Sequence, residues 1–472
     1  MGNRQKKTLV IGAGLAGKKV LEAFGGFSKD RKIIGFIDDD PQKKGAEFCG
    51  LPVLGNRHDI PGLNSRYGFD EVILAIPSAP PGEISNILEI CMKTRSRVKI
   101  MSGIYDLITG KINVRPIRDV QIEDILGRKP LSLDIGGIIS YLKDQVVLIT
   151  GAGGSVGSEL SRSVADNKPK NLILLGRGEN SIYEIEQNLK ISHPRVRIIS
   201  EIGDIKDAGR MNRLFKKHKP GIVFHTAAHK HVPYMEKNPE EAVKNNIIGT
   251  KVLCVAAMAV GCARFIFIST DKAVEPTSVM GTTKRAAELI VQLMNKKKAT
   301  KFACVRFGNI LGSRGSVLPL FERQISLGGP LTITHPEMIR YFMTVSEAAQ
   351  LVIQAGAMTK GGEIFVLDMG EPISIRDLAF KMIRLKGLEP GKDIPIKYIG
   401  IRPGEKISES LFNDEEKVMP TKHEKIMAVY GRNSSESVLR LLHTLEDPEF
   451  PYSEAQVRKL LGDFLNNLRE VK

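Results

Sequence analysis

Short apolar runs alternate with amphipathic stretches along most of this 472-residue chain. In the first part of the chain, apolar runs that are typical of buried strands occur at residues 9–11, 33–37, 71–76 and 97–100. A second series of such runs occurs at residues 145–150, 171–175, 196–200, 222–225, 265–268 and 302–306. Helical patterns separate most of these runs. The alternation predicts an α/β fold with doubly wound parallel sheets.

The chain is too long for one ordinary core, and its pattern favours separate domains. We expect a small Rossmann-like domain at residues 1–105, followed by a linker arm at 106–144 that contains a short helix at 135–142. A larger dinucleotide-binding core is expected at 145–310. The remainder, 311–472, is expected to form a small substrate-binding lobe and C-terminal helices, with some return to the core.

A glycine-rich turn follows the first predicted strand of the N-terminal domain. Gly12, Gly14 and Gly17 have the spacing G-x-G-x-x-G, and the second strand ends in the acidic residues Asp38 to Asp40. Strand, glycines, helix, strand and acid together form a dinucleotide-binding fingerprint. Such units also persist as structural or regulatory domains, so the sequence leaves open whether this domain binds a nucleotide.

A second glycine-rich turn opens the larger domain. Gly151, Gly154 and Gly157 lie between a predicted strand and a predicted helix. This arrangement lets the backbone approach a pyrophosphate at the helix N-terminus. Asp204 and Ile205 follow the third strand of this domain, where they can contact an adenine.

The second strand of this domain ends in Gly176 and Arg177, not in an acid. An Arg at this position can accept the 2′-phosphate of NADP, whereas an acid binds the ribose hydroxyls of NAD. Glu179 could still supply that carboxylate. We expect NAD, with NADP as the alternative.

Three polar residues follow the apolar run at 265–268 and the intervening Ser269: Thr270, Asp271 and Lys272. In an open parallel sheet, ligands bind beyond the carboxyl ends of the strands. An adjacent acid and base there could protonate one atom and deprotonate its neighbour. The alternative is a surface turn with a solvated Asp–Lys pair.

Composition narrows the class of ligand. The net charge of +16 favours anionic partners, but no basic stretch interleaved with aromatic residues indicates nucleic-acid binding. The anionic partners that remain are phosphorylated small molecules and an anionic membrane surface close to the protein. No apolar run reaches the length of a membrane span, and the N-terminus does not resemble a signal peptide. Five scattered cysteines without a C-x-x-C pair indicate a reducing compartment, so we expect a cytoplasmic protein without a metal site.

Five motifs occur in order: residues 150–159, 246–250, 268–272, 280–284 and 402–405. Together they resemble the extended short-chain dehydrogenase/reductases, and among them the nucleotide-sugar 4,6-dehydratases of polysaccharide biosynthesis that act on UDP-N-acetylglucosamine. The resemblance implies oxidation at C4 of the sugar, loss of the C5 proton, departure of the 6-hydroxyl as water, and hydride return to C6. It also implies a tightly held, regenerated cofactor and a homo-oligomer.

The resemblance assigns roles to individual residues. The implied catalytic residues are Thr270, Asp271, Lys272, Met280 and Lys284. The implied cofactor-binding residues are Gly151, Gly154, Ser155, Val156, Gly157, Arg177, Asp204, Ile205, Ala227, Ala228, Asn246 and Lys284. The implied UDP-binding residues are Asn309, Arg340, Arg402 and Glu405.

Two departures from the wider family pattern affect these expectations. Met280 stands where short-chain dehydrogenases usually carry Tyr, although the larger 4,6-dehydratases resemble this chain in having Met there. The base for the sugar 4-hydroxyl is therefore open, with Thr270, directly or through a water, as the candidate. The larger relatives usually carry N-terminal membrane helices, which this sequence does not show.

Alternatives remain for the function and for individual residues. A nucleotide-sugar 4-epimerase shares the fold and cofactor but needs the phenol at position 280, and a non-catalytic dinucleotide sensor would bind cofactor without turnover. Met280 could simply pack in a core, Lys284 could be an exposed helix lysine, and Arg402 and Glu405 could pair with each other in a surface turn. Whether the configuration at C5 is retained or inverted is also open.

Overall fold

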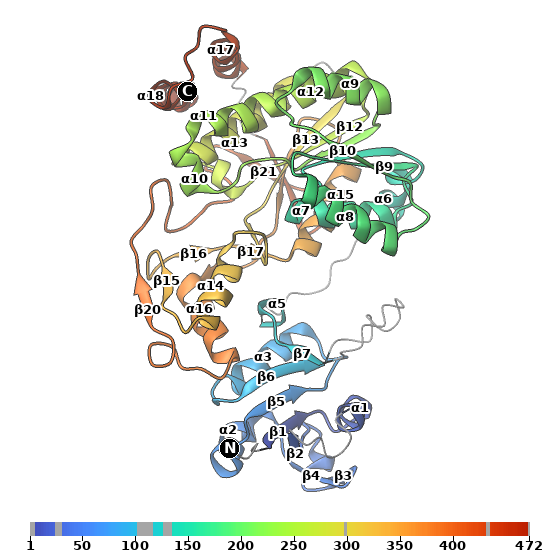
Figure 1. Ribbon diagram of the computed structural model, residues 1–472, viewed down its shortest axis with the longest axis vertical. Coiled ribbons are helices and arrows are strands. Elements are labelled where there is room, and N and C mark those ends of the chain that lie inside the picture. Colours follow the sequence, from blue (N-terminus) through green and yellow to red (C-terminus); the bar gives the residue numbers. More distant parts are fainter. Residues whose placement is uncertain are drawn as a thin grey trace. The chain divides into compact units, whose positions relative to one another are not determined.

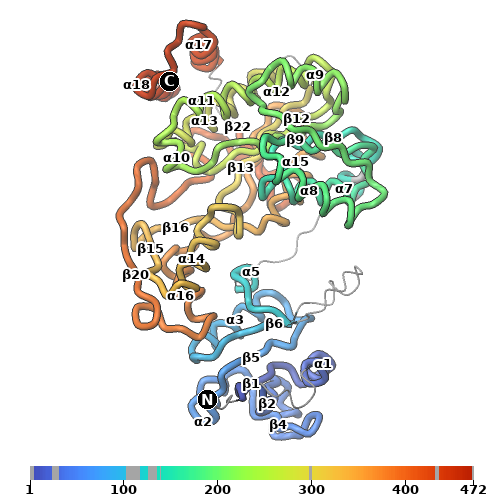
Figure 2. Tube along the Cα trace, in the orientation of Figure 1, coloured from blue at the N-terminus to red at the C-terminus, as the bar shows by residue number. Residues whose placement is uncertain are grey.

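The computed structural model describes residues 5–23, 31–101, 117–125, 135–296, 300–430 and 435–470. The chain divides into two compact units (Figures 1 and 2). Unit 1 contains Met1–Leu131, Leu320–Ile333 and Arg376–Tyr398, and unit 2 contains Ser132–Pro319, Thr334–Ile375 and Ile399–Lys472. Two segments that we expected in the C-terminal lobe therefore cluster with the N-terminal domain.

Unit 1 is built around a sheet in the order β3-β4-β2-β1-β5-β6-β7. The strands of this sheet are β1 (Lys6–Ile11), β2 (Arg31–Ile37), β3 (Glu47–Phe48), β4 (Leu51–Gly55), β5 (Glu71–Leu74), β6 (Arg97–Met101) and β7 (Ile117–Asp119). Its other elements are α1 (Leu15–Ala23), η1 (Pro41–Lys43), η2 (Arg57–Asp59), α2 (Ile60–Tyr67), α3 (Pro81–Cys91), α5 (Ile122–Ile125), α14 (Val317–Ser326), β15 (Leu331–Ile333), α16 (Ile375–Leu385) and β20 (Ile396–Tyr398). Helices α14 and α16 each begin just outside the bounds of this unit.

The N-terminal glycine fingerprint folds as predicted, but its acid has local partners. Asp38 Oδ2 accepts hydrogen bonds from the backbone nitrogen of Ala13 at 2.9 Å and from Lys43 Nζ at 3.0 Å. This carboxylate therefore ties the end of β2 to the glycine-rich turn after β1.

Unit 2 contains a sheet in the order β10-β9-β8-β11-β12-β13-β18-β22-β21. The first seven strands in this order run parallel, and β22 and β21 close the edge in antiparallel fashion. The strands are β8 (Val146–Thr150), β9 (Asn171–Gly176), β10 (Ile198–Ile202), β11 (Ile222–His225), β12 (Arg264–Ile268), β13 (Lys301–Arg306), β18 (Ile364–Leu367), β21 (Lys417–Pro420) and β22 (Ile426–Tyr430). The predicted doubly wound sheet is confirmed.

Helices connect and flank this sheet (Figure 1). They are α6 (Ile135–Leu142), α7 (Ser155–Asp166), α8 (Glu179–Ser192), α9 (Ala208–His218), α10 (Val232–Lys237), α11 (Pro239–Val243), the π-helical turn η3 (Lys244–Ile248), α12 (Gly249–Ala259), η4 (Asp271–Ala273), α13 (Val279–Asn295), α15 (Val345–Met358), α17 (Ser435–Glu446) and α18 (Glu454–Glu470). Two short strand pairs complete the unit, β14 (Asn309–Ile310) with β17 (Phe342–Met343) and β16 (Ile339–Arg340) with β19 (Ile373–Ser374).

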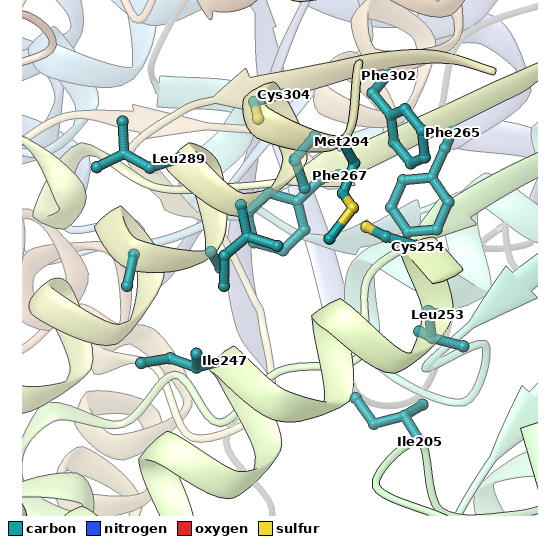
Figure 3. Packing of buried hydrophobic residues seen from close by; sticks show 14 of the residues in the cluster. Ile205, Ile247, Leu253, Cys254, Phe265, Phe267, Leu289, Met294, Phe302 and Cys304 are labelled. Atoms are coloured by element: carbon teal, nitrogen blue, oxygen red, sulfur yellow. The ribbon is translucent and has the colours of Figure 1, made fainter. Parts of the chain in front are cut away.

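The main core of unit 2 lies between the sheet and helices α12 and α13 (Figure 3). Phe265 of β12 and Phe302 of β13 pack with tilted rings whose centroids lie 5.2 Å apart, and Leu253 and Met294 belong to the same buried cluster. Because this core fixes β12 and α13 together, it also fixes the polar residues that follow β12 and those on the first turns of α13.

The strand order places a topological switch point between β8 and β11. These neighbours are connected in opposite directions along the sheet, and ligands of open α/β sheets bind at such a switch point. The glycine-rich turn follows β8, and Ala227 and Ala228 follow β11.

Parts of the expected linker, residues 106–144, form secondary structure within the two units. Strand β7 pairs antiparallel with β6 in unit 1, and the predicted short helix is α6, Ile135–Leu142, in unit 2. The Tyr141 hydroxyl anchors α6 by donating to the Ile353 carbonyl at 2.7 Å. Within the described ranges, no helix is both long and apolar enough to cross a membrane.

Candidate active site

The glycine-rich turn after β8 requires its glycines for steric reasons. Gly151 has φ +66°, and a Cβ there would lie 2.8 Å from Ala227 Cα. A Cβ on Gly157 would lie 2.2 Å from the Gly151 carbonyl oxygen. Gly154 precedes α7, and no side-chain cap bonds the first amides of this helix. Because the backbone approaches closely and carries no side chains, the turn fits a pyrophosphate.

Ser155 and Val156 form the first turn of α7. The Ser155 hydroxyl accepts a hydrogen bond from the backbone nitrogen of Arg314 at 3.0 Å. Residue 314 therefore lies beside the N-terminus of α7, although it is distant in the sequence.

A pocket of about 150 Å³ lies beside this turn. Six predicted cofactor-binding residues line it, together with four that sequence reasoning missed. The predicted ones are Gly151, Arg177, Asp204, Ile205, Ala227 and Ala228, and the missed ones are Gly176, Gly203, His229 and Asn245. Gly176, Gly203 and His229 lie at or after strand ends, which was a signal that could have found them, whereas Asn245 lies in η3 next to the predicted Asn246.

Asn246, predicted to bind the cofactor, is not among the residues that line this pocket. Its side chain accepts from the His229 backbone nitrogen at 2.9 Å and donates to the His229 carbonyl and to Thr283 Oγ1, each at 3.0 Å. Asn246 thus holds the loop after β11 against α13, which makes it a positioning residue in this structure.

Charged side chains gather at the rim of the pocket. Arg177 lies 3.8 Å from carboxylate oxygens of both Asp204 and Glu241, and Lys206 lies 2.5 Å from Glu241. Partial burial opposes ionisation of Glu241, but hydrogen bonds from Lys206 and His229 outweigh it and lower the pKa of Glu241. Arg177 therefore faces two carboxylates at the end of β9.

Thr270, Asp271 and Lys272 form a hydrogen-bonded cluster beyond β12, in which Asp271 is buried and Thr270 and Lys272 are partly buried. Thr270 caps the short helix η4, and its hydroxyl donates to Asp271 Oδ1 at 2.8 Å. Lys272 Nζ donates to the same oxygen at 3.0 Å. Asp271 is fully buried, and its Oδ2 has no hydrogen-bond partner among the described residues. A Cβ on Gly308 would lie 3.1 Å from this oxygen, so a glycine there leaves room beside it.

Two further residues contact Lys272 from later parts of the chain. Asn309 Oδ1, predicted as a UDP ligand, accepts from Lys272 Nζ at 3.2 Å. Glu409 Oε1 lies 3.7 Å from the same nitrogen and was missed by sequence reasoning, because no motif links it to Lys272. Burial raises the pKa of Glu409; the nearby Lys272 opposes this shift and Asp271 adds to it.

Met280 and Lys284 lie one turn apart on α13, and both are buried. Met280 is 2% exposed and belongs to the main core of unit 2. Lys284 Nζ donates to the Ile268 carbonyl at 2.5 Å and lies 3.8 Å from the Phe267 ring centroid. Burial lowers the pKa of Lys284 to about 7. Lys284 is therefore not an exposed helix lysine, and strong pKa perturbation is typical of functional sites.

The remaining predicted UDP ligands have intramolecular partners. Arg402, about half exposed, donates from Nε to Glu405 Oε1 at 3.0 Å, as in the self-paired alternative. Arg340 is 8% exposed, and its guanidinium donates to the carbonyls of Ile339, Lys406 and Ile407 at 2.7–2.8 Å. In this structure Arg340 therefore holds the 402–409 segment in place.

The sequence of this chain matches a known protein family and several known proteins. The family model described as "Polysaccharide biosynthesis protein" matches residues 147–431. The probable polysaccharide biosynthesis protein EpsC of Bacillus subtilis is 49% identical over 87% of this chain and 69% of its own length. A UDP-N-acetylglucosamine 4,6-dehydratase (inverting) of Campylobacter jejuni is 33% identical over 60% of this chain and 82% of its own. A UDP-glucose 4-epimerase of Rickettsia bellii is 35% identical over 58% of this chain and 79% of its own.

Solved structures share the fold. Pen from Bacillus thuringiensis matches with a TM-score of 0.58 and 35% identity, over 62% of this chain and 90% of its own. DesIV from Streptomyces venezuelae, a dTDP-glucose 4,6-dehydratase solved with NAD and TYD bound, matches with a TM-score of 0.50 and 21% identity, over 56% of this chain and 87% of its own. The family model covers more than half of the chain, and EpsC resembles nearly all of it. This protein therefore belongs to the polysaccharide biosynthesis protein family.

Proposed function

We propose that this protein is a nucleotide-sugar 4,6-dehydratase that converts UDP-N-acetylglucosamine to a UDP-4-keto-6-deoxy sugar for surface glycan synthesis. The observation that carries the proposal is the pair of buried Asp271 and partly buried Lys272 beyond β12, in the same unit as the glycine-rich turn. A buried carboxylate oxygen without a partner is costly unless a ligand supplies one. An acid and a base held side by side suit the removal of a proton and a hydroxyl from adjacent carbons.

The cofactor in this proposal is NAD. The steric requirement for Gly151 and Gly157 and the pocket beside them fit a dinucleotide whose adenosine lies near Asp204 and Ile205. Bound NAD would accept the hydride from C4 and return it to C6. Arg177 already faces Asp204 and Glu241, and these carboxylates would repel a 2′-phosphate, which favours NAD over NADP.

The chain's own residues then move the protons. Thr270 takes the proton of the 4-hydroxyl and passes its own proton to Asp271 Oδ1, to which it already donates. Lys272, as the neutral amine, removes the C5 proton that the new 4-ketone has made acidic. Protonated Asp271 donates to the 6-hydroxyl oxygen, which leaves as water. Lys272 returns its proton to C5, so that the net change is the loss of one water.

The structure gives two supports for dehydration over epimerisation. A 4-epimerase does not require the Asp271–Lys272 pair, whose Lys272 here also contacts Asn309 and Glu409. Met280 offers no phenol, and its side chain is part of the core. The relatives at about a third identity include both activities, so the reaction must be measured directly.

The test is incubation of the purified protein with UDP-N-acetylglucosamine, followed by NMR of the product. Dehydration predicts a 6-methyl signal and a 4-keto (or hydrated) carbon, with no net change in bound cofactor. Formation of the C4 epimer with the 6-hydroxyl retained would identify the epimerase. Cofactor binding with unchanged sugar would identify a sensor.

A further inference from the structure

Glu409 reaches the catalytic pair from a segment that is pinned against it. Arg340 binds the Lys406 and Ile407 carbonyls of this segment. Lys406 Nζ donates to the Val274 carbonyl at 3.0 Å, just after η4. These bonds place the Glu409 carboxylate, 5% exposed, 3.7 Å from Lys272 Nζ. Its second oxygen, Oε2, is buried without a hydrogen-bond partner among the described residues.

A count of protons shows why a third group is needed, given the proposed function. At rest, the geometry is that of an ion pair, with Lys272 as ammonium and Asp271 as carboxylate. The site then receives one proton from the 4-hydroxyl and must remove another from C5. Asp271 can hold the first, but an ammonium cannot accept the second. Lys272 must therefore pass one of its protons to another acceptor before it can act as the base.

We propose that Glu409 is the positioning residue that holds this proton. Glu409 takes a proton from Lys272 once Asp271 has been protonated through Thr270, and Lys272 becomes the neutral base. After Asp271 has given its proton to the departing 6-hydroxyl and Lys272 has returned the C5 proton, Glu409 gives its proton back to Lys272. Every proton is accounted for, and no other reactant is required.

The surroundings of Glu409 suit a side chain that alternates between the carboxylate and the protonated carboxyl group. The charged side chains that influence it are Lys272, Asp271, Arg340 and Lys406. Burial, which raises the pKa of Glu409, favours the protonated form. Lys272 and Arg340, at 3.7 and 4.0 Å, favour the carboxylate. Burial outweighs the nearby cations, so the pKa of Glu409 lies above its usual value and the carboxylate accepts a proton more readily than an exposed one would.

The kinetic test uses Glu409→Gln in the full-length holoenzyme, with Asp414→Asn as the matched control because Asp414 is an exposed carboxylate on the same loop. We expect E409Q to reduce kcat at neutral pH by about 10- to 100-fold, with little change in KM. Rapid-mixing absorbance should still show C4 oxidation, while exchange of the C5 proton slows. The deficit should shrink as pH rises, because solvent then removes the Lys272 proton. Glu409→Asp should restore part of the rate.

An equal loss in C4 oxidation and C5 exchange, or a pH-independent deficit, would overturn the proposal. A test without substrate separates it from the proposed function. Lys272 is partly accessible, so its acetylation by a small reagent can be followed by mass spectrometry as a function of pH. E409Q should accelerate acetylation of Lys272 several-fold relative to wild type and D414N, because the carboxylate no longer favours the ammonium. An unchanged rate would refute the coupling, even if the protein acted on another sugar.

Discussion

Replacement of Lys284 by Met should change the stability of unit 2 by an amount that depends on pH. In the unfolded chain this lysine is protonated below about pH 10.5, whereas the fold lowers its pKa to about 7 by burial. Folding between these values therefore releases a proton, and the unfolded state binds more protons than the native state. Each pH unit below 10.5 costs the wild type about 1.4 kcal/mol, a penalty that reaches about 5 kcal/mol below pH 7 and then stays constant.

Met at position 284 carries no proton, so the free energy of unfolding of K284M minus that of wild type should rise as pH falls from about 10 to 7. Between pH 9.5 and 7.5 the rise should be about 3 kcal/mol. The substitution also removes the hydrogen bond to the Ile268 carbonyl and the contact with Phe267. These losses shift the stability difference by the same amount at every pH and leave its dependence on pH unchanged.

Urea unfolding of the cofactor-free protein can measure this difference at several pH values. The chain has no Trp, so labelling of Cys254, buried in the core of unit 2, is a specific probe of that unit. Lys237→Met, at an exposed position, is the matched control. A stability difference that is the same at every pH would contradict the buried-amine explanation. The variant should also lose turnover, because the family resemblance implies a catalytic role for Lys284.

Three further variants test the site. Asp271→Asn and Lys272→Ala should each reduce dehydration by at least about 100-fold while cofactor binding persists; normal turnover in both would refute their roles. Gly157→Ala should abolish cofactor binding, since its Cβ would lie 2.2 Å from the Gly151 carbonyl oxygen, whereas Gly462→Ala, with open space around it, should bind normally in calorimetry. Arg177→Ala should leave the preference for NAD over NADP intact in competition assays. Loss of that preference would show that the Arg177 guanidinium discriminates between the 2′-hydroxyl of NAD and the 2′-phosphate of NADP.

The sequence predicted those parts of the fold that depend on local patterns. The parallel strands from β8 to β13 come from apolar runs, and only β10 is displaced, to Ile198–Ile202. The glycine-rich turn was recognisable because Gly151 and Gly157 meet backbone atoms of nearby elements. The antiparallel edge formed by β21 and β22 was missed, because its pairing depends on residues that come much later than the core strands.

The site was predictable only where its residues are neighbours in the sequence. Thr270, Asp271 and Lys272 follow one strand, so their place beyond its carboxyl end could be predicted, whereas the burial of Asp271 could not. Glu409 joins them through a fold-dependent segment, so nothing in the local sequence signals its contact. Arg340 has the side chain of a diphosphate ligand, but three backbone carbonyls occupy its guanidinium. Such competition between backbone and ligand becomes visible only in three dimensions.

Solvent-deuterium labelling at C5 of the sugar tests most directly whether Asp271 and Lys272 act as an acid and a base on neighbouring carbons. The wild-type protein is incubated with UDP-N-acetylglucosamine in deuterated water, and the product is analysed by NMR and mass spectrometry. We predict one deuterium at C5 of a 4-keto-6-deoxy product, and no C5 exchange with Lys272→Ala. A product without deuterium at C5 would contradict proton exchange between C5 and solvent-derived protons on Lys272, and full exchange with Lys272→Ala would assign the base elsewhere.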